Sequence, residues 1–150
     1  MIIDTSVLVA LILREPEAVP FTLAMAAAPV RRLSAASYVE LAAVIDGRQD
    51  PVLSNALDAS IRASRIEVVP FTVEQARIAR VAYQQFGRGS EHPARLNIGD
   101  CFAYALARDL GEPLLFKGDD FARTDIELVI EPVRSRRLSE VVAAYVAGSG

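Results

Sequence analysis

Met1-Ile-Ile-Asp4-Thr-Ser6 opens the chain, and this stretch decides the fold class. Its three apolar residues predict a short buried strand, and the polar residues at positions 4 to 6 are all competent helix N-caps. The apolar run from Val7 to Leu13 then predicts a helix, broken by Glu15-Pro16. A buried strand that passes directly into a helix is the unit from which parallel α/β sheets are built.

The alternation of strand and helix continues along the chain. Further short strands are expected at 31–34, 66–70, 113–116 and 127–130. Helices are expected at 18–28, 35–47, 51–64, 72–86, 100–110 and 139–147, and 87–97 is the one clear loop. The sequence therefore predicts a single α/β domain over residues 1–150, a three-layer α/β/α sandwich with a central, mostly parallel sheet. The tail after about residue 132 is not assigned to this pattern.

Composition excludes several classes of protein. A chain of 150 residues that is 52% hydrophobic with a net charge of −3 is not disordered. One cysteine, Cys101, cannot form a disulfide within the chain and suits a reducing compartment. No apolar run is long enough to span a membrane, and the start lacks the basic segment of a signal peptide. We therefore expect a cytoplasmic protein with no membrane segment.

Acidic residues interrupt apolar surroundings at several points. Asp4 ends the first strand, Glu40 lies within an apolar helix, and Asp100 opens another. Asp119 and Asp120 follow the strand at 113–116. Because the carboxyl ends of parallel strands meet at one sheet edge, we expect these carboxylates to converge there. Each has a simpler interpretation: Asp4 and Asp100 as helix caps, and the Asp119-Asp120 pair as a surface turn.

Carboxylates that share a pocket repel one another unless they are protonated or neutralised by a cation. Oxygen ligands without nearby histidine or cysteine favour Mg²⁺ or Mn²⁺. Such an ion polarises a phosphoryl oxygen and activates water, which points to hydrolysis of a phosphodiester.

Other chemistries find little support. His92 is the only histidine and lies in a Gly/Pro loop, so neither a zinc site nor a Ser-His-Asp triad is expected. No phosphate-binding glycine motif follows the first strand. Cys101 is expected to be a core thiol, because its helical neighbours are apolar.

Four segments in register give the chain a family resemblance. They are Met1-Ile-Ile-Asp-Thr-Ser-Val-Leu-Val-Ala, Ser37-Tyr-Val-Glu-Leu, Leu96-Asn-Ile-Gly-Asp-Cys-Phe-Ala-Tyr-Ala-Leu-Ala and Leu114-Leu-Phe-Lys-Gly-Asp-Asp-Phe-Ala-Arg-Thr-Asp-Ile. With them the chain resembles the VapC toxins, PIN-domain nucleases of VapBC toxin–antitoxin modules, from residue 1 to about 130. The resemblance implies a Mg²⁺- or Mn²⁺-dependent endoribonuclease that leaves a 5′-phosphate and a 3′-hydroxyl, forms a homodimer and is inhibited by a VapB antitoxin.

Site residues follow from this resemblance position by position. Asp4 and Asp100 match the metal-binding positions of the family, and Glu40 matches its third acid. Many members carry the fourth acid where this chain has Gly118, so Asp119 or Asp120 must serve here. Asp120 is preferred, because the Asp-Phe pair that it begins also matches.

Four further residues are expected to contact substrate. Thr5 and Ser6 match polar residues that line the family's pocket and could hold a water beside the metal. Arg88 and Arg95 flank the loop before Asp100, so they are candidates for holding the RNA backbone. Their alternative role is to solvate that loop.

Two other functions remain open. One is a receiver-like signalling domain, with Lys117 after a strand, although only one acid follows the first strand where receivers carry a pair. The other is an inactive PIN-like binding protein, which the presence of all the acids disfavours.

Overall fold

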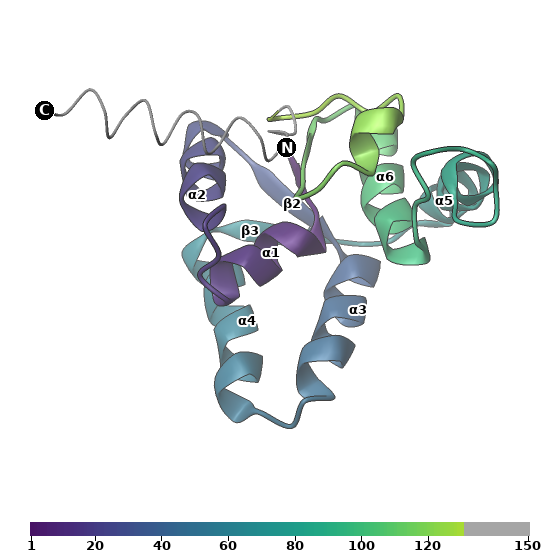
Figure 1. The fold of residues 1–150 in the computed structure, drawn as a ribbon. Helices are drawn as coiled ribbons and strands as arrows, with labels where there is room; N and C mark the ends of the chain where they lie inside the picture. Colours follow the sequence, from purple (N-terminus) through teal and green to yellow (C-terminus); the bar gives the residue numbers. More distant parts are fainter. Residues whose placement is uncertain (131–150) are drawn as a thin grey trace, which may run out of the picture.

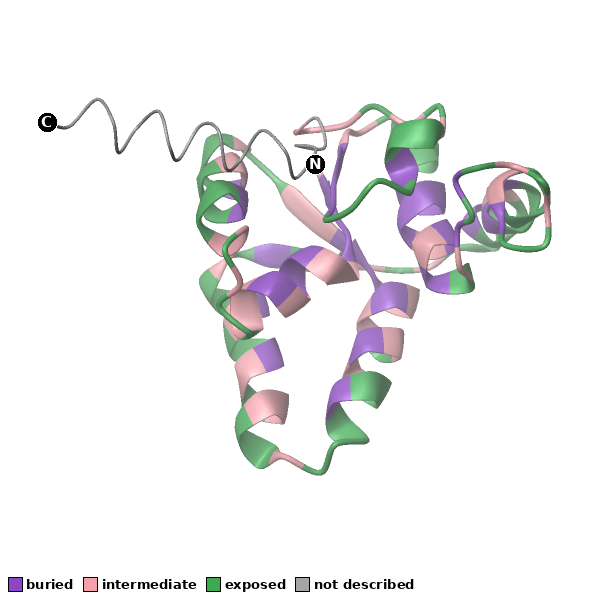
Figure 2. Cartoon of the chain, viewed as in Figure 1, coloured by how far each residue is buried: buried purple, intermediate pink, exposed green. Residues whose placement is uncertain are grey.

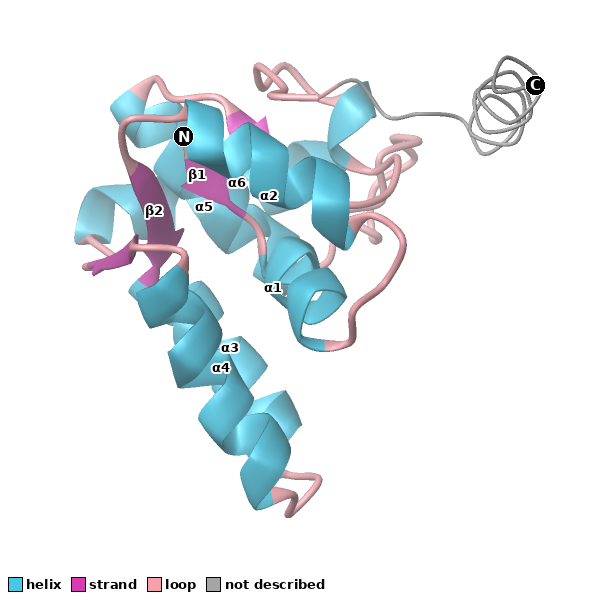
Figure 3. Ribbon diagram, turned by 90° about the vertical axis from the view of Figure 1, so that its left-hand side faces the viewer, coloured by secondary structure: helices cyan, strands magenta, loops and turns pink. Residues whose placement is uncertain are grey.

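The computed structural model describes residues 1–130, and these form a parallel sheet flanked by helices (Figure 1). Its strands are β1 (Ile2–Ile3), β2 (Arg31–Ser34), β3 (Ile66–Val69) and β4 (Leu114–Leu115), in the order β3-β2-β1-β4. Every pairing among them is parallel, with Ile2 of β1 opposite both Arg32 and Leu114. Figure 3 shows β1 beside β2 and the chain leaving β1 directly into α1.

Helices make up most of the described chain. None of them is both long enough and apolar enough to cross a membrane. They are α1 (Thr5–Ile12), α2 (Ala18–Ala27), α3 (Ala35–Asp46), α4 (Pro51–Ala63), α5 (Val73–Phe86), α6 (Ile98–Leu110) and a short 3₁₀ turn, η1 (Phe121–Arg123).

Two hydrophobic cores lie on opposite faces of the sheet. Ile2 and Leu114 pack into the core that contains α5 and α6. The next residue of each strand, Ile3 or Leu115, packs into the core that contains α1 to α4. Consecutive strand residues point to opposite faces, so full burial of both members of each pair requires helices on both sides (Figure 2). The predicted three-layer α/β/α sandwich and its parallel sheet are confirmed.

The helix pair α3 and α4 extends away from the sheet as an antiparallel hairpin (Figure 1). Pro51 occupies the first turn of α4, and the Asp50 carboxylate accepts hydrogen bonds from the backbone N–H of Val52 and Leu53 at 2.9 and 3.4 Å. Leu57 and Ile61 bury one face of α4. Its other faces remain in solvent, as the amphipathic sequence predicts.

Several predicted boundaries are wrong. Residues 127–130 form a single bridge, Leu114 to Leu128, instead of a strand. β4 is two residues long, where 113–116 was expected. The helix expected at 100–110 begins at Ile98, because Asn97 and not Asp100 is its N-cap. The predicted helix at 139–147 lies outside the described residues.

Thr72-Val-Glu-Gln75 has the sequence pattern of a capping box, but only half of the box forms in the structure. Thr72 Oγ1 accepts the backbone N–H of Gln75 at 3.1 Å. The Gln75 side chain does not return the bond; instead its Nε2 donates to Asp109 on α6 at 2.9 Å. A tertiary contact between α5 and α6 therefore replaces the local one.

Candidate active site

An acidic pocket of about 380 Å³ opens where β1 and β4 end. Asp4 follows β1, Asp120 lies in the loop after β4, and Asp100 lies in the first turn of α6. The predicted convergence of acids at one sheet edge is therefore what the structure shows for these three. The residues lining the pocket are Asp4, Thr5, Ser6, Val9, Glu15, Asn97, Asp100, Lys117, Asp120 and Phe121.

Asp4 is the N-cap of α1. Its Oδ2 accepts the Ser6 backbone N–H at 3.0 Å and the Ser6 hydroxyl at 2.5 Å. Its side chain is buried, and burial raises the pKa of the Asp4 carboxyl despite these bonds, with a smaller contribution from repulsion by Asp120. The capping role considered from the sequence is real, and Asp4 both caps α1 and lines the pocket.

Asp100 belongs to a reciprocal capping box at the start of α6. Asn97 Oδ1 accepts the Asp100 N–H at 2.9 Å, while Asp100 Oδ2 accepts the Asn97 N–H at 2.7 Å. Burial and repulsion from Asp4 and Asp120 raise the pKa of Asp100 to about 6, against the lowering effects of its bond from Asn97 and of Arg88. One oxygen is therefore committed to the helix cap, and Oδ1 remains available.

Glu40 on α3 lies close to Asp4 but does not line this pocket. Burial, and then repulsion from Asp4, raise the pKa of its carboxyl. The carboxylate lies directly against Gly99 of α6, so closely that a Cβ atom at Gly99 would overlap both of its oxygens. Gly99 therefore makes the space in which Glu40 comes near Asp4.

The two aspartates after β4 differ in position. Asp120 lines the pocket and is close enough to Asp4 and Asp100 to raise the pKa of both. Both residues are exposed, but Asp119 does not line the pocket. The geometry favours Asp120 as the fourth acid.

The remaining predicted residues separate into two groups. Thr5 and Ser6 line the pocket. Arg88 and Arg95 are exposed and do not line it, although Arg88 is near enough to Asp100 to lower its pKa. Their predicted contact with substrate stays a prediction.

Sequence reasoning missed three polar residues of this pocket. Asn97 could have been recognised, because Asn97-x-x-Asp100 is itself a capping-box pattern. Glu15 and Lys117 are separated by 102 positions and meet through a hydrogen bond of 2.9 Å. No local pattern in the sequence signals such a pairing.

The oxygen donors of the site suit Mg²⁺ or Mn²⁺. Within residues 1–130, no three side chains of His, Cys, Asp or Glu are close enough to ligate one ion together. Mg²⁺ keeps several waters and is commonly bound by one or two carboxylates, so this spacing suits it. Asp4 and Asp100 both line the pocket, and their raised pKa values, caused first by burial and then by repulsion from neighbouring carboxylates, fit a cation held by these two residues.

Cys101 and His92, the other two residues considered as nucleophile or metal ligand, do not belong to this site. Cys101 is fully buried, and burial raises the pKa of its thiol to about 12, which confirms a core thiol. His92 packs its ring against Phe86, with centroids 4.8 Å apart, and its Nδ1 accepts the backbone N–H of Ala94 at 3.2 Å. His92 therefore stabilises its own loop.

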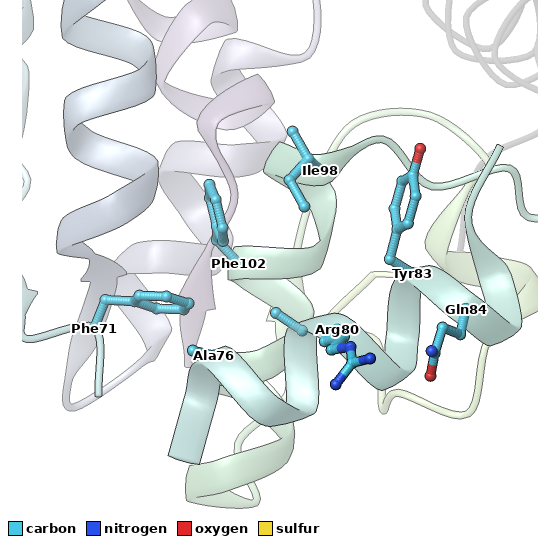
Figure 4. Close-up of a pocket in the computed structure, with 8 residues that line it drawn as sticks. Phe71, Ala76, Arg80, Tyr83, Gln84, Ile98 and Phe102 are labelled. Carbon is cyan, nitrogen blue, oxygen red and sulfur yellow. The ribbon is translucent and has the colours of Figure 1, made fainter. Parts of the chain in front are cut away.

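A second hollow lies between α5 and α6 (Figure 4). Its lining is mostly apolar, and it contains no carboxylate that could hold a metal. Phe71 and Phe102 meet edge to face at its floor, with centroids 5.1 Å apart. The residues around it are Phe71, Ala76, Ala79, Arg80, Tyr83, Gln84, Ile98 and Phe102.

The fold and the acidic pocket together define a parallel α/β domain with carboxylates gathered at its strand ends. The PIN domain family model matches residues 1–127. The chain belongs to the PIN-domain family.

Individual relatives are similar over almost their whole length. Ribonuclease VapC28 of Mycobacterium tuberculosis is 52% identical over 131 residues, which are 87% of this chain and 98% of that protein. Ribonuclease VapC42 of the same species is 48% identical over 126 residues, 84% of this chain and 96% of that protein. Among solved structures, VapBC2 of Rickettsia felis bound to a promoter DNA fragment matches with a TM-score of 0.64 and 16% identity, covering 85% and 94% of the two chains. The last comparison concerns the fold alone.

Proposed function

We propose that this chain is an endoribonuclease that hydrolyses RNA phosphodiester bonds with the help of Mg²⁺ or Mn²⁺. The observation that carries the proposal is the meeting of Asp4, Asp100 and Asp120 around one pocket, in which burial and repulsion disfavour the charged forms of Asp4 and Asp100. Relatives at about 50% identity are named ribonucleases, which supports the same substrate class here.

Each acid has a proposed part. Asp4 and Asp100 would hold the ion, which when bound polarises a phosphoryl oxygen and lowers the pKa of water. Glu40 and Asp120 would complete the shell of the ion through bound water, or orient the attacking water. Glu40 suits the acceptance of a proton, because its raised pKa makes it a stronger base than an exposed glutamate. Thr5 and Ser6 are proposed to hold water within the pocket. The expected products carry a 5′-phosphate and a 3′-hydroxyl.

Purified protein incubated with single-stranded RNA tests this proposal. Cleavage is expected with Mg²⁺ or Mn²⁺ and is expected to stop in excess EDTA. An Asp4→Asn protein purified in parallel controls for contaminating nucleases. Turnover that persists in EDTA would contradict the metal dependence, and equal turnover by both proteins would contradict the proposed site.

Two further measurements address the alternative functions. Phosphoryl transfer from acetyl phosphate to an aspartate would favour the receiver-like function, which membership of the PIN-domain family already opposes. RNA binding without any cleavage would favour an inactive binding protein.

A VapB-type antitoxin is the partner that completes this proposal. An apolar groove between α1, α3 and α4 supports it, because exposed Leu13 and Val44 lie there beside the buried core. Titration with the cognate antitoxin should inhibit cleavage. The groove is lined by Val9, Ile12, Leu13, Leu41, Val44, Ile45, Arg48 and Leu53.

A homodimer in the cytoplasm is also proposed. Light scattering of the purified protein would measure its mass.

The two aspartates after β4 give a direct prediction. Asp120→Asn is expected to lower the cleavage rate by about 10-fold or more, because Asp120 lines the pocket, whereas Asp119→Asn leaves it unchanged. Rates of both variants at saturating Mn²⁺ provide the measurement. A larger loss for Asp119→Asn would place the fourth acid at the other residue.

The raised pKa values predict how pH acts on the metal-free protein. The folded state holds a proton on Asp100 up to about pH 6, whereas the unfolded chain releases it near the ordinary 3.8. The folded state therefore binds more protons between these pH values, so stability falls as pH rises through that window. Because Asp100 is only half-buried, solvent screening leaves an effect of about 1 kcal/mol.

Thermal unfolding in EDTA at pH 5 and pH 7 measures this effect. Asp100→Asn should remove much of the difference. Added Mn²⁺ should raise the melting temperature at pH 7 and much less at pH 5, because protons compete with the ion for the same oxygens. An equal Mn²⁺ effect at both pH values would show that these carboxylates do not bind the ion.

A further inference from the structure

Lys117 is the only lysine in the chain, and it lies at the rim of the acidic pocket. Among the described residues it is the one cationic side chain that lines this pocket. Its Nζ donates to Glu15 Oε2 at 2.9 Å and lies 3.2 Å from Glu17 Oε2. The ammonium is therefore occupied by two glutamates instead of by the aspartates of the site.

The backbone of Lys117 is fixed to the same site. Its N–H donates to Ser6 Oγ at 3.0 Å, and the Ser6 hydroxyl in turn donates to Asp4 Oδ2 at 2.5 Å. The Cα of Lys117 thus has a defined position relative to Asp4. Its side chain is 35% exposed and is paired only with partly exposed carboxylates. Such pairs contribute little net stability and exchange readily.

The charge of Lys117 is opposite to that of the acids that line the pocket. A polynucleotide that enters this pocket meets Asp4, Glu15, Asp100 and Asp120, all of which repel phosphate. A cation held by Asp4 and Asp100 would offset part of this repulsion at those two residues. Lys117 is the positive group that the protein itself brings to the pocket, where an RNA phosphate would otherwise meet carboxylates.

We propose that Lys117 is a substrate-binding residue whose ammonium leaves Glu15 and Glu17 to contact an RNA phosphate next to the bond that is cleaved. This inference rests on the proposed ribonuclease function. Lysine suits the task, because its compact ammonium is a point charge with three donors on a flexible stem. Hydrogen bonding to Glu15 raises the pKa of the Lys117 ammonium, so it stays charged at neutral pH. Glu15 and Glu17 act as competitors that RNA must displace.

Two variants test the proposal, because they are expected to change the Kd for RNA in opposite directions. Binding of a short single-stranded RNA is measured in EDTA, so that no cleavage occurs under the proposed mechanism. Lys117→Met should raise Kd about 10-fold through loss of one charge-assisted contact. It should also reduce the slope of log affinity against log salt by about 0.7, the value of one phosphate contact with a single strand. The double variant Glu15→Gln/Glu17→Gln should lower Kd by about 3-fold or more, because the competitors have lost their charge.

A purely structural Lys117 would behave differently. If the ion pairs of Lys117 with Glu15 and Glu17 only stabilise the local structure, Lys117→Met and the double glutamine variant both break them. Both variants would then shift the Kd for RNA in the same direction, and the inference would be wrong. Lys117→Arg keeps the charge and should restore most of the binding. Circular dichroism checks that each variant is folded; should Lys117→Met fail to fold, the direction of the shift in the double glutamine variant and the binding of Lys117→Arg decide the matter.

Two controls separate the contact from general electrostatics. The glutamine pair is repeated in the Lys117→Met background, where no tightening is expected; tightening there would overturn the inference. Arg77→Met removes one charge from an exposed pair with Glu74, 3.1 Å apart, and should leave Kd and the salt slope unchanged. Wild-type protein that neither binds nor cleaves RNA would refute the proposed function itself, whereas wild-type cleavage with an unaltered Lys117→Met refutes only the role of Lys117.

Discussion

Asp4→Asn is expected to reduce RNA cleavage by about 10³-fold and to abolish Mn²⁺ binding while the fold is kept, since it removes one of two charged oxygen donors from the proposed ion. The amide oxygen of asparagine can still accept the Ser6 N–H at the start of α1. Because burial raises the pKa of Asp4, a neutral side chain there should raise the melting temperature at pH 7 in EDTA.

A matched control for this change exists elsewhere in the chain. Asp50 is also a helix N-cap, and its carboxylate accepts the Val52 N–H at 2.9 Å, far from the pocket in sequence. Asp50→Asn should leave cleavage and Mn²⁺ binding unchanged. Calorimetric titration with Mn²⁺ and cleavage assays on both variants distinguish loss of the ion from loss of a cap. Undiminished Mn²⁺ binding by Asp4→Asn would remove Asp4 from the proposed ligands.

Gly99→Ala is expected to lower cleavage by about 10- to 100-fold, although it changes no acid, because the added Cβ occupies the place of the Glu40 carboxylate. The carboxylate is the free end of a flexible side chain, so it can move aside without disturbing the backbone. Alanine is also the better helix former, by up to about 1 kcal/mol. The variant should therefore be as stable as the wild type or more so, yet less active.

Comparison with Glu40→Gln identifies the cause of this loss. If Gly99→Ala acts by displacing Glu40, combining the two changes should cost little more than either alone. Gly89→Ala is the matched control, because a Cβ at Gly89 would meet no atom within 4 Å. Full activity in Gly99→Ala would mean that Glu40 does not need its present position, and additive losses would point to two separate effects.

The strand–helix alternation allowed the fold class to be predicted. Ile2 and Ile3 are both fully buried, so a continuous apolar run correctly signalled a strand covered on both faces. Element ends were less predictable. Gln75 bonds to Asp109 of another helix instead of to its own N-cap, and residues 127–130 make one bridge only. At Gln75 a tertiary partner replaced the local one, whereas residues 127–130 pair with β4 at a single position.

The acids that meet at the pocket could be anticipated because topology alone brings the carboxyl ends of parallel strands together. Asp4 directly follows β1, and Asp120 lies a few residues beyond β4. Asp100 lies in the first turn of a helix at the same edge. What each carboxylate is bonded to could not be anticipated. The commitment of Asp100 Oδ2 to the Asn97 N–H, which leaves one oxygen for an ion, depends on local geometry at the start of α6.

The sequence by itself thus determined the parallel sheet, its two covered faces and the edge at which the acids gather, because periodicity and chain order act through the backbone. Only the tertiary structure decided that Gly99 makes room for Glu40 and that Lys117 is held by Glu15 and Glu17. These contacts join residues far apart in the chain through side-chain packing and charge. No local pattern encodes them, since each depends on the distance between elements after they have folded together.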